Sequence, residues 1–230
     1  MKLSSKLLIL TMVIFSNPSF SSDDYVKLGT SILSDLVAIE STAGMGLATE
    51  VSELSKTLLL NNGFNDENLK VVGPTDTSKG LYAVYKGQSS TKPVIVMAHI
   101  DVVPAVKDAW DTNPFQLVEI DGFLHGRGAS DNKGGAAALL TTFIRLKEEG
   151  FTPKNDIIML LTGDEETGMN SIRYFRDNFE SVRQAPFAFN SDGGYITGTM
   201  KNPEAFRLQS AEKVYMTVTM TTSNRGGHSS

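Results

Sequence analysis

Six acidic or histidine side chains in this 230-residue sequence have the types and the order of the ligands of a hydrolytic metal centre. They are His99, Asp101, Asp131, the adjacent pair Glu165 and Glu166, and Asp192. Zinc binds histidine nitrogen and carboxylate oxygen readily, and two metal ions about 3.5–4 Å apart need a bridging carboxylate and further ligands for each ion. The residues therefore predict a centre that holds two zinc ions, for which Co2+ or Mn2+ could substitute.

Three of these positions follow apolar runs, either directly or within a few residues. His99 follows residues 94–98, the glutamate pair follows residues 157–161, and Asp192 follows residues 186–189. Such runs indicate strands buried in a parallel sheet, whose carboxyl ends form one edge where ligands bind. Taken singly, each residue is more often a solvated side chain or a turn former. Because all of them are expected at the same edge of the sheet, together they predict a single binding site.

The spacing of these residues also suggests their roles. Asp131 lies where a glycine-rich loop enters a predicted helix over residues 134–149, which suits a bridging carboxylate. Asp101 is a candidate to orient the His99 ring, because a metal-bound histidine usually donates its other N–H to a neighbouring acceptor. Of the adjacent Glu165 and Glu166, one can bind metal while the other stays free as a general base.

The remaining periodicity predicts an α/β fold with a layered, mostly parallel sheet and helices on both faces. Helical stripes cover residues 24–39, 49–61, 134–149 and 171–179, and β-like runs cover residues 69–72 and 81–85. Residues 206–210 and 214–222 alternate as antiparallel strands do. We therefore expect a catalytic domain over residues 23–211 and the beginning of an α+β lid or dimerisation domain over residues 212–230.

The first 22 residues are expected to be a signal peptide rather than part of the fold. Lys2 and Lys6 precede an apolar stretch over residues 7–15, and small residues follow as far as Ser22. The stretch is too short for a membrane anchor, which needs about 20 apolar residues. We therefore expect a bacterial protein that is secreted or periplasmic.

Composition excludes several other classes of function. There is no cysteine, which rules out disulfides, thiolate ligands and a cysteine nucleophile. The formal net charge is −5 and no basic stripe occurs, so nucleic acid and membrane surfaces are not expected partners. There is no Gly-x-Ser-x-Gly elbow of a serine hydrolase and no P-loop.

The sequence resembles the aminoacylase/carboxypeptidase family of di-zinc metallopeptidases over about residues 94–230. This family includes folate-type glutamate carboxypeptidase, acetylornithine deacetylase, succinyl-diaminopimelate desuccinylase and carnosinase-like dipeptidases. The motifs that carry the resemblance are Met97-Ala-His-Ile-Asp101, Gly126-Arg-Gly-Ala-Ser-Asp-Asn-Lys-Gly-Gly135, Gly163-Asp-Glu-Glu-Thr-Gly168, Asp192-Gly193 and Gly226-Gly-His-Ser-Ser230. The residue before Lys133 is often Met in this family and is Asn132 here, a departure that we expect to be tolerated.

The resemblance implies a role for each ligand. His99 matches a ligand of the first zinc ion, Asp131 the bridging carboxylate and Glu166 a ligand of the second ion. Asp192 matches the remaining carboxylate ligand. The family's last ligand is a histidine further along the chain, for which this sequence has no residue. We therefore expect an N-terminal fragment that binds its second metal weakly and hydrolyses little.

The resemblance also implies three catalytic residues. Asp101 matches the acid that orients the His99 ring, and Glu165 matches the general base. His228 matches a lid-domain histidine that stabilises the oxyanion, often in the active site of the other subunit of a homodimer. From the sequence itself, His228 fits a plain turn equally well, and His125 fits a structural role in a hairpin-like turn.

We expect hydrolysis of an amide bond next to a free carboxylate. The reaction would be that of a dipeptidase, a carboxypeptidase or an N-acyl-amino-acid deacylase, with a small peptide or N-acyl amino acid as substrate. The alternatives are a truncated, inactive binding protein of the same fold and another metal-dependent hydrolase, such as a phosphoesterase.

Overall fold

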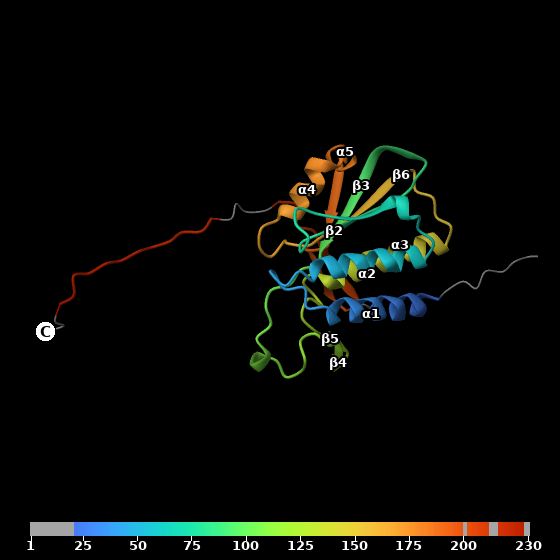
Figure 1. Cartoon of the computed structure of the whole chain (residues 1–230). Helices are drawn as coiled ribbons and strands as arrows, with labels where there is room; N and C mark the ends of the chain where they lie inside the picture. The colour runs from blue at the N-terminus through green and yellow to red at the C-terminus, as the bar shows by residue number, and fades with distance from the viewer. Residues whose placement is uncertain (1–20, 200–201, 212–215, 228–230) are drawn as a thin grey trace, which may run out of the picture. The chain divides into compact units, whose positions relative to one another are not determined.

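The computed structural model describes residues 21–199, 202–211 and 216–227. A five-stranded sheet forms its centre, in the order β1 (Leu69–Val72), β2 (Gly80–Tyr85), β6 (Asn155–Thr162), β3 (Ser89–His99) and β7 (Phe187–Asn190). β3 is parallel to both β6 and β7, whereas β2 is antiparallel to β1 and β6 (Figure 1). The predicted α/β fold with a mostly parallel sheet is confirmed.

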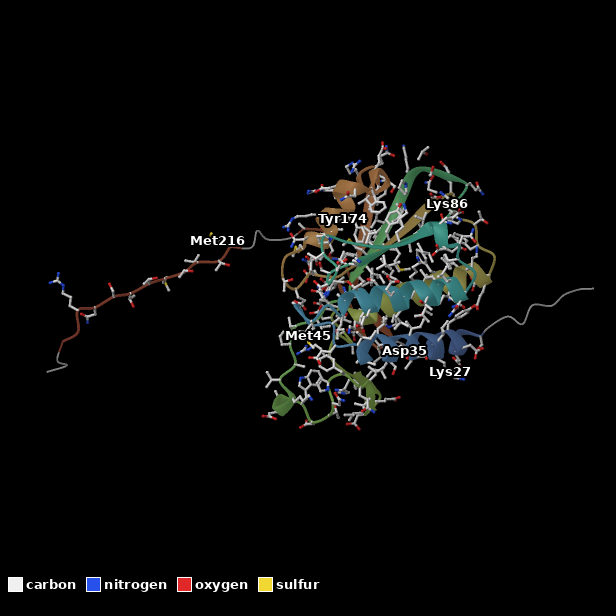
Figure 2. All side chains as sticks on the ribbon, viewed as in Figure 1. Lys27, Asp35, Met45, Lys86, Tyr174 and Met216 are labelled. Atoms are coloured by element: carbon white, nitrogen blue, oxygen red, sulfur yellow. The ribbon has the colours of Figure 1, made fainter. Side chains whose placement is uncertain are left out.

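Helices cover both faces of this sheet (Figure 1). α1 (Ser22–Ala38), α2 (Ala48–Asn61) and α3 (Lys133–Glu148) lie on one face, and α4 (Asn170–Asn178) and the short α5 (Glu180–Arg183) lie on the other. Successive residues of β2 point into opposite cores. Leu81 and Ala83 pack against α1–α3, whereas Tyr82 and Val84 face α4 and α5. Figure 2 shows the side chains that fill both layers.

Between β3 and α3 the chain leaves the sheet. It forms a short 3-10 helix, η2 (Lys107–Ala109), and a hairpin of β4 (Val118–Ile120) and β5 (Phe123–His125). The two turn residues, Asp121 and Gly122, have φ of 53° and 80°, the left-handed conformation that a tight two-residue hairpin requires. A second 3-10 helix, η1 (Asp66–Asn68), precedes β1.

One prediction about burial is wrong. The sequence predicts a third buried strand over residues 186–189, but Phe187 and Phe189 of β7 are 62% and 59% exposed. β7 lies at the edge of the sheet and pairs with β3 on one side. An apolar run therefore placed the strand correctly, but it did not distinguish an edge strand from a central one.

Residues 193–230 form a unit separate from residues 1–192. Its strands, β8 (Tyr195–Gly198) and β9 (Pro203–Arg207), make an antiparallel sheet of their own. This division falls before the expected domain boundary at residue 212, because β8 and β9 pair with each other and not with the five-stranded sheet. Residues 216–222, where a strand is predicted, form neither helix nor strand, and residues 212–215 lie outside the described residues. The domain boundary itself stays a prediction.

None of the described helices has the length and apolar character needed to cross a membrane. The expected signal peptide falls on residues 1–20, which lie outside the described part of the chain, and on Ser21 and Ser22, the N-cap and the first residue of α1. α1 begins with a capping box, in which Ser21 and Asp24 each accept a hydrogen bond from the other's backbone N–H.

We predict that Phe143→Ala lowers the free energy of unfolding by about 3–5 kcal/mol, because Phe143 is buried between α3 and the sheet. Its ring stacks 6.0 Å from Phe64 and meets Tyr85 edge-on at 5.7 Å. Phe123→Ala is the matched control, since Phe123 is 72% exposed and its loss should cost about 0.5 kcal/mol. Urea unfolding measures both, and equal losses would contradict this account of the core.

Candidate metal centre

The structure gathers five of the six candidate side chains into two overlapping groups at the carboxyl ends of β3, β6 and β7. One group is His99, Asp131 and Asp192, and the other is His99, Glu165 and Glu166. Within each group the potential ligand atoms lie within 4.8 Å of one another. The predicted convergence on one edge of the sheet is present, with His99 common to both groups. The role of each residue as a ligand stays a prediction.

His99 is the last residue of β3 and is 2% exposed. Its Nε2 lies 2.7 Å from Oδ1 of Asp131 and 3.7 Å from Oδ1 of Asp192. Its Nδ1 lies 3.0 Å from the main-chain carbonyl oxygen of Asp101, which can only accept a hydrogen bond. In the neutral ring Nδ1 therefore carries the hydrogen, and Nε2 is left to bind a metal ion.

The sixth candidate, Asp101, is 1% exposed and does more than orient the ring. Its Oδ1 lies 3.5 Å from Nδ1 of His99, further away than its own carbonyl oxygen. Both carboxylate oxygens accept backbone N–H groups, one from Glu165 and one from Glu166, at 3.0 Å each. Asp101 thus holds the glutamate pair beside His99, a role that the sequence analysis missed.

The site concentrates negative charge around one imidazole. Burial by itself lowers the pKa of His99, but the hydrogen bond and charge of Asp101, the hydrogen bond to Asp131 and the charge of Asp192 outweigh it and raise the pKa to about 9. Burial is also the largest cause that raises the pKa of both Glu165 and Glu166, and nearby carboxylates add to it. A bound divalent cation would relieve this repulsion.

The donor set fits a metal ion of zinc's kind. It combines one imidazole nitrogen with carboxylate oxygens and contains no sulfur, a combination that zinc accepts. The His99 side chain is buried at the inner side of the site, whereas the side chains of Asp131 and Asp192 are 67% and 28% exposed. The site is therefore open to solvent on the carboxylate side, as a hydrolytic centre needs.

Lys133 supports the loop that carries Asp131. The side chain is fully buried, and its Nζ donates to the carbonyl oxygens of Leu36 at 2.8 Å and Ile39 at 2.6 Å. These carbonyls end α1, whose last turn has no basic residue of its own. Burial lowers the pKa of Lys133 to about 7. Lys133 stands in a motif that carries the family resemblance, but the sequence analysis gave it no role, and its partners could not be predicted from the sequence.

Asp164 supports the loop that carries the glutamate pair. Its carboxylate accepts the backbone N–H groups of Asn170 and Ser171, at 2.8 Å each, at the start of α4. It also accepts a hydrogen bond from the Ser171 hydroxyl. The N-cap residue of α4 is Met169, so Asp164 does not stand where the sequence signal of an N-cap is expected, and the sequence analysis gave it no role.

Of the other two histidines, only His125 lies within the described residues, and it belongs to neither group. His125 is exposed and pairs with Val118 in the β4–β5 hairpin, and its expected structural role stays a prediction. His228 lies outside the described residues, so its expected role as a lid histidine stays a prediction.

Comparison with known proteins adds three similarities. The model of the peptidase family M20/M25/M40 matches residues 95–218. The N-fatty-acyl-amino acid synthase/hydrolase PM20D1.1 of Danio rerio is 33% identical over 156 residues, which are 65% of this chain and 30% of that protein. The solved structure of human carnosine dipeptidase 1 aligns with a TM-score of 0.65 at 24% identity, over 76% of this chain and 40% of its own. The chain thus spans less than half the length of these relatives.

A further solved structure, the YXEP protein of Bacillus subtilis, is described as a dinuclear metal binding peptidase of the M20 family. It aligns with a TM-score of 0.52 at 14% identity, over 74% of this chain and 43% of its own. At this identity the similarity concerns the fold alone.

We predict that Asp101→Asn weakens metal binding about 10–100-fold, because the amide NH2 cannot accept one of the two glutamate N–H groups. The unpartnered N–H should also lower the free energy of unfolding by about 1–3 kcal/mol. Both quantities can be measured, by competition with a chromophoric chelator and by urea unfolding.

Asp156→Asn is the matched control for this prediction. Asp156 is also buried, and it accepts hydrogen bonds from the Gly87 N–H and from Lys86 at the amino end of β6 (Lys86 is labelled in Figure 2). The Asp156→Asn variant should have a lower free energy of unfolding than the wild type but the same affinity for the metal ion. Unchanged affinity in Asp101→Asn would refute the positioning role of Asp101.

Proposed function

Because this chain belongs to the peptidase family M20/M25/M40, we propose that it forms the metal-binding part of a hydrolase that cleaves amide bonds. The observation that carries the proposal is the convergence of His99 with four carboxylates at one edge of the sheet. Family membership alone would leave the chemistry of this chain open. The geometry supports it, because the side chains that the reaction needs are already gathered in one place.

We propose that the site holds two zinc ions. His99, Asp131 and Asp192 would hold one ion and Glu166 would help to hold the other, with Asp131 as the bridge. The YXEP protein, described as dinuclear, supports two ions, and the oxygen and nitrogen donors support zinc over softer metals. When bound, the ions would lower the pKa of a water molecule and polarise the carbonyl group of the substrate.

In this proposal Glu165 is the general base. Its backbone N–H is held by Asp101, and its carboxylate lies in the same cluster as His99 and Glu166. It can therefore take a proton from the attacking water and pass it to the leaving amine. Glu166 is held in the same way but is assigned to the metal, so the pair divides into a base and a ligand.

For the substrate we propose an amide next to a free carboxylate, either a dipeptide or an N-acyl amino acid. This choice is supported by the names of the relatives, one an N-fatty-acyl-amino acid hydrolase and the other a carnosine dipeptidase. The comparisons do not favour the inactive binding protein. Export by the signal peptide, dimerisation through a lid domain and stabilisation of the oxyanion by His228 are further parts of the proposal.

We predict that Glu165→Gln lowers turnover of the preferred dipeptide or N-acyl amino acid at least about 100-fold, because the amide cannot accept the proton. Metal content per chain should stay at the wild-type value. Glu67→Gln, which changes an exposed glutamate in η1, is the control and should change neither quantity. If Glu165→Gln loses metal as well as turnover, Glu165 is a ligand rather than the base.

A second prediction concerns metal removal and the class of substrate. Dialysis against a chelator should abolish hydrolysis of dipeptides and N-acyl amino acids, and Zn2+ should restore it, because the carboxylate cluster needs the ion to act on a carbonyl. Phosphate esters assayed in parallel should not be hydrolysed. Metal-dependent cleavage of the esters alone would replace the amidohydrolase proposal with a phosphoesterase.

A further inference from the structure

Two polar residues outside the ligand set connect the neighbours of two proposed ligands. Asn132 directly follows Asp131, and Ser191 directly precedes Asp192. The Ser191 hydroxyl oxygen lies 3.1 Å from Oδ1 of Asn132. Asn132 is 1% exposed, so water does not reach its end of this hydrogen bond.

Both partners of this hydrogen bond are fixed to the framework. Asn132 is the N-cap residue of α3, and its carbonyl oxygen accepts the N–H of Ala136 at 3.0 Å. The backbone N–H of Ser191 donates to the carbonyl oxygen of Met97 in β3 at 3.0 Å, two residues before His99. The bond therefore joins the start of α3, the end of β7 and the end of β3, the three segments that carry Asp131, Asp192 and His99.

The donors and acceptors of Ser191 and Asn132 allow two orientations of this hydrogen bond. The Ser191 hydroxyl has one hydrogen but two acceptors in reach, Oδ1 of Asn132 and the Met97 carbonyl oxygen at 3.2 Å. Meanwhile Nδ2 of Asn132 is buried and has no hydrogen-bond partner among the described residues. Turning the carboxamide over would let Nδ2–H donate to Ser191 and the hydroxyl donate to Met97, while Oδ1 would take the buried position that Nδ2 leaves. In either orientation one hydrogen bond joins the Asn132 carboxamide to the Ser191 hydroxyl.

Space for this pair depends on Gly135. A Cβ atom at Gly135 would overlap with both Oδ1 of Asn132 and the hydroxyl oxygen of Ser191. The overlap involves two side-chain atoms that are already bonded to each other, so neither could move without breaking the bond. The second glycine of the Lys133-Gly-Gly motif therefore leaves the room that the pair occupies.

We propose that Asn132 and Ser191 are positioning residues that set the separation between the Asp131 and Asp192 carboxylates. Both carboxylates face Nε2 of His99, at 2.7 Å and 3.7 Å, and both have solvent-exposed surface, so the loops behind them must fix their spacing. The bond between Asn132 and Ser191 joins those two loops directly. This inference rests on the proposed metal centre and assigns a task to Asn132, the position where we expected a departure from the family to be tolerated.

The test compares metal binding in variants that remove one partner each. Asn132→Leu keeps the shape of the side chain without its hydrogen bonds, and Ser191→Ala removes the hydroxyl. Each should raise the dissociation constant for Zn2+ about 10–100-fold and shift the visible absorption bands of the Co2+-substituted protein. The double variant should lose no more than the larger single loss, because the two residues act through one bond.

Conservative and distant variants serve as controls. Ser191→Thr retains the hydroxyl and should keep the wild-type dissociation constant and Co2+ spectrum. Asn65→Leu and Ser90→Ala change exposed residues that belong to neither ligand group and should have no effect. The Co2+ spectrum reports ligand geometry, which a loss of stability alone would not alter.

The outcomes separate this inference from the proposed function. Wild-type affinity and spectra in Asn132→Leu and Ser191→Ala would overturn the positioning role and leave the metal centre standing. Additive losses in the double variant would show that the two residues act independently and would also overturn it. A wild-type chain that binds no metal would overturn the metal centre itself, and this inference with it.

Discussion

The site depends on one buried carboxylate that is shared between two strands. Asp101 follows β3, and its two oxygens accept the backbone N–H groups of Glu165 and Glu166, which follow β6. The same residue offers its carbonyl oxygen to the His99 ring. A buried carboxylate costs free energy unless hydrogen bonds satisfy it, so Asp101 requires both loops to be in place. The histidine and the glutamate pair are thereby fixed relative to each other.

The rest of the site consists of similar links between segments that are distant in sequence. Lys133 connects the Asp131 loop to the end of α1, Asp164 caps α4 behind the glutamate loop, and Asn132 meets Ser191 between α3 and β7. None of these residues is a proposed ligand. They hold like-charged side chains close together against the mutual repulsion that would drive those side chains apart. A preorganised site of this kind loses less entropy when it binds an ion.

The sequence predicted the parts of this arrangement that depend on local pattern. Apolar runs located β3 and β6, and the acidic residues after them marked the carboxyl edge where His99 and the glutamate pair lie. Hydrogen bonds between loops were not predictable, because they depend on three-dimensional geometry that periodicity does not encode. The exposure of Phe187 was missed for a related reason, since an apolar strand reads the same at the edge of a sheet as at its centre. The β8–β9 hairpin was missed in part, because the alternating pattern over residues 206–210 overlaps only the end of β9 and no pattern indicated β8.

The bond from Lys133 to α1 ties the order of folding to the assembly of the site. Lys133 contacts carbonyl groups 97 and 94 residues earlier in the chain, so the contact closes a very long loop. Loops of this length are closed late and slowly, after local helices and neighbouring strands have formed. We therefore expect the Asp131 loop to reach its final position only when α1 has docked beside α3, because Lys133 bonds to the end of α1. Metal affinity would therefore appear as one of the last properties the chain acquires during refolding, and a metal-sensitive probe would report the end of that process rather than its beginning.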